Sequence, residues 1–193
     1  LGPANIATMK LAQKDINAAG GVLGKDIEIT SADTSDADHA DQNTSSAQSV
    51  LAKNPSVVVG PPSSSVVKNT YKQVTSAKVP MISSGATSTA FSGLSDYFFR
   101  TIPPDTVQGA VLGQIIAQDG VKNLAIAVFN DEYGTSLRDV VVKTVEDAGV
   151  NVVYGEKDTF DPTETNFSSM VTAIKATNPD ATLVIAFDQT VPL

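Results

Sequence analysis

Three consecutive serines stand where a small anionic or zwitterionic solute could be bound. Ser63, Ser64 and Ser65 follow Pro61-Pro62, and these prolines exclude a helix before the serines. Serine is a favoured N-cap, so we expect a helix to begin here, with a dipole that favours a carboxylate or phosphate at its N-terminus. Helix capping without any ligand is the alternative explanation of these serines.

A second hydroxyl-rich segment runs from Ser84 to Thr89, with Gly85, Ala86 and Thr87 at its centre. Glycine lets a ligand approach the backbone closely, and the hydroxyl groups donate and accept hydrogen bonds. A turn that merely needs glycine is the alternative. Tyr133 could add an aromatic wall from elsewhere, or pack on its own helix. The ligand-binding candidates are Ser63, Ser64, Ser65, Gly85, Ala86, Thr87 and Tyr133.

Residues for catalysis or metal binding are sparse. His39 is the only histidine, lies among aspartates and has no cysteine to complete a zinc site, so a solvated polar face is expected. Gly24-Lys25 lacks the Ser or Thr of a phosphate-binding loop and precedes a predicted strand. No serine is flanked by the glycines of a nucleophile elbow. We therefore expect neither an enzyme, a metal site nor a cofactor.

Helical and strand patterns alternate along the chain, which is typical of βαβ units around parallel sheets. Ligands of such sheets bind beyond the carboxyl ends of the strands, where both hydroxyl segments lie. The first predicted helix carries Ile6, Met9, Ala12 and Ile16 on one face. In the first lobe, residues 1–102, we predict helices over 4–19, 38–53 and 64–77 and strands over 26–32, 57–60, 80–83 and 97–101.

Consecutive prolines mark a linker between two lobes. Ile102-Pro103-Pro104-Asp105 stiffens the chain and excludes a helix, and residues 103–105 are the predicted hinge crossover. Residues 106–193 then form the first part of a second α/β lobe. There we predict helices over 106–118, 135–148 and 167–176 and strands over 123–129, 151–156 and 182–187.

Composition excludes some partners. The net charge is −8, from 21 acidic and 13 basic residues, and the bases form no cluster. Because phosphate backbones are bound by clustered Lys and Arg, no nucleic-acid partner is expected. Every apolar run is far shorter than the roughly 20 residues that span a bilayer. Absence of cysteine excludes disulfides without indicating a compartment.

Five motifs together resemble one family in order and spacing, the periplasmic leucine/isoleucine/valine-binding receptors. The resemblance covers the whole chain and implies a type I periplasmic binding protein fold, with two Rossmann-like, flavodoxin-like α/β lobes on parallel sheets. The motifs are Asp15-Ile16-Asn17-Ala18-Ala19-Gly20-Gly21-Val22-Leu23-Gly24, the turn from Gly60 to Ser65, Ser84-Gly85-Ala86-Thr87, Phe99-Arg100-Thr101 and Asp131-Glu132-Tyr133-Gly134.

Carried over by position, the resemblance implies roles for individual residues. Ser64 would donate its hydroxyl and backbone N–H to the ligand α-carboxylate, and Ala86 and Thr87 would contact its carboxylate and ammonium. Tyr133 would press from the second lobe, and Ile102 to Asp105 would form the first hinge crossover. On this pattern we expect residues to be missing at both ends. They include an opening strand, the first ligand loop and the acid that usually pairs with the ammonium.

The resemblance implies an extracytoplasmic solute-binding component of an ABC importer. Its ligand would be a branched-chain or related amino acid, or a similar small polar solute, and its partner a membrane permease. The protein would be periplasmic or extracellular, with a lipid anchor left open for the full-length protein. A ligand-sensing domain of a receptor or amide sensor with the same fold is the alternative. An α/β enzyme is less favoured, because no base stands near a nucleophile.

Overall fold

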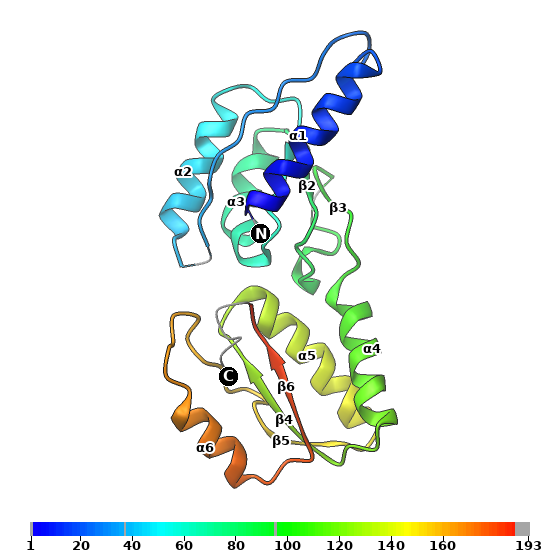
Figure 1. Ribbon diagram of the computed structural model, residues 1–193, viewed down its shortest axis with the longest axis vertical. Helices are drawn as coiled ribbons and strands as arrows, with labels where there is room; N and C mark the ends of the chain where they lie inside the picture. Colours follow the sequence, from blue (N-terminus) through cyan, green and yellow to red (C-terminus); the bar gives the residue numbers. More distant parts are fainter. Residues whose placement is uncertain (1, 37, 95, 188–193) are drawn as a thin grey trace.

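Two parallel three-stranded sheets form the framework of the protein. The computed structural model describes residues 2–36, 38–94 and 96–187, and its sheets lie one above the other along the long axis (Figure 1). The strand orders are β1-β2-β3 and β5-β4-β6. We call the first sheet with its helices lobe one and the second sheet with its helices lobe two.

Lobe one is built around three short strands, of which the first has no buried residue and the other two are buried in part. Met81 in the central strand is wholly buried and packs with Val67, Val74, Phe91 and Phe98. Helix α3 contacts both α2 and β2. The elements are α1 (Gly2–Ala18), α2 (Ala40–Leu51), β1 (Val58–Val59), α3 (Ser64–Ser76), β2 (Met81–Ser83), the 3-10 helix η1 (Thr89–Phe91) and β3 (Phe98–Arg100).

Lobe two has a longer central strand and a tightly packed helix pair. Strand β4 lies between β5 and β6, and five of its six residues are buried. Gly109 and Gly113 on α4 lie against α5, where an added Cβ would be only 2.7 Å from the Cβ atoms of Val140 and Thr144. The elements are α4 (Asp105–Gln118), β4 (Asn123–Val128), α5 (Glu132–Asp147), β5 (Asn151–Tyr154), α6 (Ser168–Ala176) and β6 (Ala181–Ile185).

The predicted strand at residues 26–32 is wrong, because this segment is in no sheet. The backbone N–H of Ile27 donates to Asn17 Oδ1 at 2.8 Å. The carbonyl of Ile27 accepts from Asn17 Nδ2 at 3.0 Å and from Gln13 Nε2 at 2.9 Å. Side chains of α1 therefore satisfy the polar groups that a neighbouring strand would have paired, although the alternating pattern is that of a strand.

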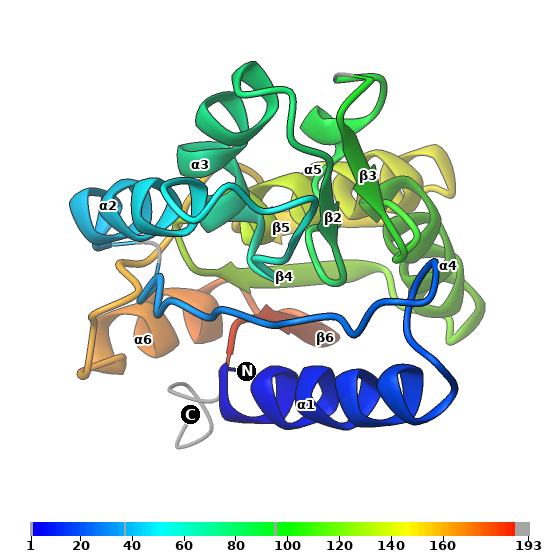
Figure 2. The same cartoon turned by 90° about the horizontal axis from the view of Figure 1, so that it is seen from above.

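Helix α1 forms as predicted, but its apolar face is not a core face. None of its described residues is buried, and Ile6 and Ile16 remain 43% and 37% exposed. Figure 2 shows α1 at one side of the molecule, apart from α2 and α3. The periodicity of Ile6, Met9, Ala12 and Ile16 predicts the helix correctly, whereas the burial of that face depends on a packing partner.

The segment between β3 and α4 contains the predicted hinge residues Ile102, Pro103, Pro104 and Asp105. Pro104 is the N-cap of α4, and Asp105 is the first residue of that helix. The predicted linker thus ends one residue earlier than expected, and Asp105 is wholly buried. Movement about this segment stays a prediction. Among the helices of the described residues, none has the length and apolar character needed to cross a membrane.

Candidate functional site

The two hydroxyl segments meet at the carboxyl edge of the first sheet. Strands β1 and β2 are parallel neighbours, so the chain leaves both at the same edge. Ser63 caps α3, with its hydroxyl accepting from Val66 N at 3.4 Å. Ser64 Oγ accepts from the backbone N–H of Ser88 at 3.3 Å, and Ser64 is only 1% exposed. Ser64 thus joins the start of α3 to the second segment, while Ser63 has the capping role expected of a serine at this position.

Gly85 allows the second segment to lie directly against the first. A Cβ at this position would be 2.6 Å from the carbonyl oxygen of Pro62, which is too close for any side chain. Ser83 adds a second link, because its hydroxyl donates to Pro61 O at 2.6 Å and accepts from Ala86 N at 3.1 Å. The glycine in this motif is therefore explained by close packing of two backbone segments.

Arg100 holds the second segment in a tight curve. Its Nη1 donates to three consecutive carbonyl oxygens, of Ala86 at 3.3 Å, Thr87 at 3.1 Å and Ser88 at 2.8 Å. A single guanidinium that binds three successive carbonyls fixes the backbone of this segment before any ligand arrives. Thr87 is buried, and its Oγ1 has no hydrogen-bond partner among the described residues.

Asp105 brings a carboxylate to the same place. Its backbone N–H donates to the carbonyl oxygen of Thr87 at 2.8 Å, so the two residues are neighbours. Asp105 is 0% exposed, and within the part of the chain that the structure describes neither carboxylate oxygen accepts a hydrogen bond. A buried carboxylate without a partner is costly, as is a buried hydroxyl. A positively charged donor such as an ammonium group would satisfy both.

Tyr133 faces this locus from lobe two. It lies in the first turn of α5, half-buried, with its ring stacked on Phe187 at a centroid distance of 5.7 Å and near Phe129 at 6.4 Å. Burial raises the pKa of the Tyr133 hydroxyl, the nearby charge of Asp105 raises it further, and a hydrogen bond with Gln108 lowers it. The ring thus packs on its own lobe, while its hydroxyl lies close enough to Asp105 for the charge of that carboxylate to raise the pKa of the hydroxyl.

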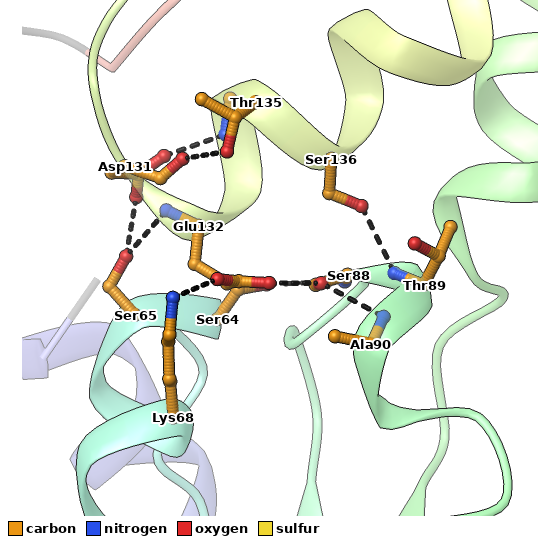
Figure 3. Close-up of polar contacts among 11 residues, drawn as sticks. Ser64, Ser65, Lys68, Ser88, Thr89, Ala90, Asp131, Glu132, Thr135 and Ser136 are labelled. Carbon is orange, nitrogen blue, oxygen red and sulfur yellow. Dashed lines mark hydrogen bonds and ion pairs between the residues drawn. The ribbon is translucent and has the colours of Figure 1, made fainter.

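Ser65 contacts lobe two directly (Figure 3). Its hydroxyl donates to Asp131 Oδ2 at 2.9 Å and accepts from the backbone N–H of Glu132 at 3.0 Å. Asp131 is the N-cap of α5 and also accepts from Gly134 N at 2.6 Å. Burial raises the pKa of the Asp131 carboxyl, and these hydrogen bonds oppose that rise. The Ser65 hydroxyl is therefore engaged by the second lobe in this arrangement.

The described residues contain no group of three or more His, Cys, Asp or Glu side chains arranged to hold a metal ion. His39 forms a surface pair with Asp36, with 2.5 Å between Nδ1 and Oδ1. The hydrogen bond to Asp36 raises the pKa of His39, as does the charge of that aspartate. The pair has the solvated character that the sequence predicts.

Several residues of the site were missed by reasoning from the sequence. The sequence indicates only a hinge role for Asp105, because an acid after two prolines has the pattern of an exposed linker. The sequence shows Arg100 only as part of a motif, and its position at the end of a strand is the signal that points to the site. Ser88 lies within the predicted segment without an assigned role. Asp131, an acid just before a helical pattern, is recognisable as an N-cap.

Comparison with known sequences gives one consistent family. A family model described as "Periplasmic binding protein" matches residues 1–193. The Leucine-, isoleucine-, valine-, threonine-, and alanine-binding protein of Pseudomonas aeruginosa is 33% identical over 168 residues. That alignment covers 86% of this chain and 44% of the Pseudomonas protein, so the chain spans less than half the length of this relative.

Solved structures agree with the sequence matches. A branched-chain amino acid transporter substrate binding protein from Streptococcus pneumoniae, in complex with isoleucine, has a TM-score of 0.78 and 27% identity, with 91% of this chain and 49% of that chain covered. A solute binding protein from R. palustris, in complex with 4-hydroxybenzoate, has a TM-score of 0.80 and 22% identity, with 88% and 46% covered. The second likeness concerns the fold alone.

Proposed function

The chain belongs to the periplasmic binding protein family, and we propose that it forms the ligand-binding part of an extracytoplasmic solute-binding protein that serves an ABC importer. Its fold is the type I periplasmic binding protein fold that the sequence predicts, of which it spans about half. The ligand of the proposed site is an amino acid, and its protein partner is the membrane permease of the importer.

One observation carries this proposal, the meeting of an unpaired hydroxyl, an unpaired carboxylate and a helix N-terminus at one sheet edge. Thr87 Oγ1 and the Asp105 carboxylate are buried without hydrogen-bond partners among the described residues. Ser64, the first residue of α3, is tied to the adjacent Ser88. The great majority of buried polar groups in folded proteins are paired, so two unpaired groups in neighbouring residues point to a partner from outside the chain.

A zwitterion matches this arrangement of charges. The N-terminus of α3 has free backbone N–H groups and the positive end of a helix dipole, which suit a carboxylate together with the hydroxyl of Ser64. Asp105 and Thr87 suit an ammonium group, which has three donors and carries the charge that a buried carboxylate requires. Tyr133 provides an aromatic surface from lobe two for the remaining part of the ligand.

Binding alone accounts for the proposed role. A ligand held by Ser64 and Thr87 of lobe one and by Asp105 and Tyr133 of lobe two makes its full set of contacts only when the lobes are close together. It therefore shifts an equilibrium between open and closed arrangements towards the closed one. A permease that recognises the closed arrangement would receive only the loaded protein. Proteins that share this chain's fold, including the one crystallised with isoleucine, bind ligands of this size.

A small aromatic acid is the second candidate ligand. Phe129, Tyr133, Phe160 and Phe187 form a run of ring contacts, with centroids 5.0 to 6.4 Å apart. A benzoate ring could extend this run, and its carboxylate could still use the N-terminus of α3. Such a ligand has no ammonium group and leaves Asp105 unpaired. The zwitterion is therefore the better match.

Calorimetry on the full-length protein tests the proposal with L-isoleucine, L-threonine and 4-hydroxybenzoate as probes. We expect an amino acid to bind, and Thr87→Ala and Asp105→Asn each to weaken that binding by about 1–3 kcal/mol, the typical cost of an unpaired buried polar group. Thr75→Ala is the matched control, because its hydroxyl bonds only within α3, to Tyr71 O.

The outcomes separate the two ligands and the proposal itself. If 4-hydroxybenzoate binds and Asp105→Asn leaves its affinity unchanged or improves it, the aromatic acid is the ligand. If an amino acid binds with the same affinity to wild type, Thr87→Ala and Asp105→Asn, the site is elsewhere and the assignment is wrong.

A further inference from the structure

Glu132 reaches from lobe two to two different side chains of lobe one (Figure 3). Its Oε2 lies 2.6 Å from Lys68 Nζ on α3, and its Oε1 accepts from Ser88 Oγ at 2.7 Å. The Glu132 side chain is only 15% exposed, whereas that of Lys68 is 63% exposed. A charge-assisted pair with one sheltered partner is stronger than an ordinary surface ion pair.

Backbone contacts reinforce these side-chain bonds. The backbone N–H of Glu132 donates to Ser65 Oγ at 3.0 Å, so Glu132 uses both its backbone and its carboxylate to contact lobe one. One turn later on α5, Ser136 Oγ accepts from the backbone N–H of Thr89 at 3.0 Å. The first turns of α5 therefore lie across the start of α3 and η1, as Figure 3 shows.

We propose that these bonds form an interlobe clasp, centred on Glu132, that sets how readily the two lobes close and that acts without touching the ligand. The clasp consists of Glu132 and its partners Ser65, Lys68 and Ser88. Every bond in it joins residues more than 40 positions apart in the chain, one in each lobe. Separation of the lobes breaks all of them, so they stabilise only the closed arrangement. The clasp is a positioning device, because none of its bonds requires a bound solute.

Ser88 connects the clasp to the proposed ligand site. Its backbone N–H donates to Ser64 Oγ, its carbonyl accepts from Arg100 at 2.8 Å, and its hydroxyl donates to Glu132. Ser88 directly follows Thr87, so one short segment carries both the unpaired hydroxyl and the bond to the other lobe. The lobe movement that brings Ser88 to Glu132 therefore also brings Thr87 to the ligand-facing residues of lobe two, which couples binding to closure.

Weakening the clasp should lower the fraction of closed molecules before any ligand is added. An apparent affinity is reduced by the fraction of molecules that are competent to bind, so a weaker clasp weakens binding of every ligand by the same factor. This distinguishes Glu132 from a residue of the ligand site, whose replacement changes affinity differently for different ligands. The clasp depends on the lobe closure proposed above but not on the identity of the solute.

Single-molecule distance measurement tests the clasp without any ligand. Residues 1–193 contain no cysteine, so Gln48→Cys on α2 and Lys175→Cys on α6, with any cysteine elsewhere in the full-length protein replaced, place one dye on an exposed position of each lobe. In the full-length protein, we expect Glu132→Ala to lower the ratio of closed to open molecules by about tenfold or more, the effect of losing a hydrogen bond to a charged group. Lys68→Met should lower it less, because Lys68 is more exposed.

Matched variants keep the test decisive. Lys143→Met removes an ion pair of similar length from the same helix, to Asp147 at 2.7 Å, but this pair lies within lobe two and should leave the distances unchanged. Glu132→Gln keeps the shape of the side chain, and reversible urea unfolding of each variant shows that it is folded. Identical distance distributions for wild type, Glu132→Ala and Glu132→Gln would overturn the proposal. That result would leave the solute-binding proposal standing, since calorimetry with Thr87→Ala tests it separately.

Discussion

Asp105→Asn should make the ligand-free protein more stable while it weakens ligand binding. Asp105 is 0% exposed, and neither of its oxygens accepts a hydrogen bond within residues 2–36, 38–94 and 96–187. Leaving a buried polar group unpaired costs about 1–3 kcal/mol, and more when the group is charged. Asn has nearly the same size and shape but no charge, so the substitution removes the larger part of this cost.

One opposing effect must be subtracted. Asp105 is the first residue of α4, where a negative charge interacts favourably with the helix dipole by about 0.3–1 kcal/mol. The desolvation cost is larger than this gain, so we expect the free energy of unfolding to rise by about 1 kcal/mol. For a chain of this size that corresponds to roughly 2–4 °C in Tm.

The assay is urea unfolding without ligand, in which a change in midpoint at constant slope reports stability. Asp41→Asn is the matched control, because Asp41 lies in the first turn of α2 but is exposed. It loses only the dipole interaction and should be slightly destabilised. If Asp105→Asn is instead destabilised by 1 kcal/mol or more, Asp105 has a structural partner and its reservation for a ligand is wrong. Loss of the Asp105 charge should also lower the pKa of Tyr133, as followed by ultraviolet titration.

Three further predictions concern titration and backbone geometry. Asp36→Asn should lower the raised pKa of His39 towards its ordinary value, which NMR of the only histidine measures, and an unchanged pKa would contradict the pairing. Because burial raises the pKa of Asp131, its folded form binds protons more readily than its unfolded form, so its contribution to stability should fall as pH rises from about 3.8 through the raised pKa. Unfolding curves of wild type and Asp131→Asn between pH 3.5 and roughly 7 check this, and equal slopes against pH would refute it. Gly155→Ala should destabilise the folded protein by about 3 kcal/mol or more, since the φ of Gly155 is +83° and a Cβ would lie against a carbonyl oxygen of β4. Gly149→Ala is the control, because Gly149 has a φ of +81° but open space around it, and it should cost only about 1–2 kcal/mol. Thermal unfolding measures both free-energy changes.

Most of the fold could be predicted from the sequence because the local patterns agree with it. The helices over α2 to α6 and the six strands of the two sheets form within a few residues of their predicted bounds. The type I periplasmic binding fold is confirmed by the family match and the solved structures. The segment at 26–32 failed because period-two alternation describes side chains, whereas a strand also needs a backbone partner. The backbone N–H and carbonyl of Ile27 instead form hydrogen bonds with the side chain of Asn17.

The candidate site was predictable in part. The rule that ligand loops follow the strands of a parallel sheet selected both hydroxyl segments, and the structure joins them through Ser64 and Ser88. The ligand contacts of these residues and the lobe boundary at the prolines stay predictions. The roles of Arg100 and Asp105 in the site could not be predicted, because they depend on which backbone carbonyls and helices surround these two residues. A sequence does not report such distances.

Sequence alone determined the kinds of group available: serines that begin α3, a glycine with no room for a side chain, a threonine, and an acid after two prolines. These follow from local rules, because capping, turn geometry and periodicity act over a few residues. Tertiary structure alone decided which of these groups are hydrogen-bonded within the protein and which are left without a partner among the described residues. Ser65 is paired with Asp131, whereas Asp105 is buried and its carboxylate has no partner among the residues that the structure describes, although both are polar residues at the start of a helix. The difference is burial against particular neighbours, since the cost of an unpaired charge exists only where water is excluded.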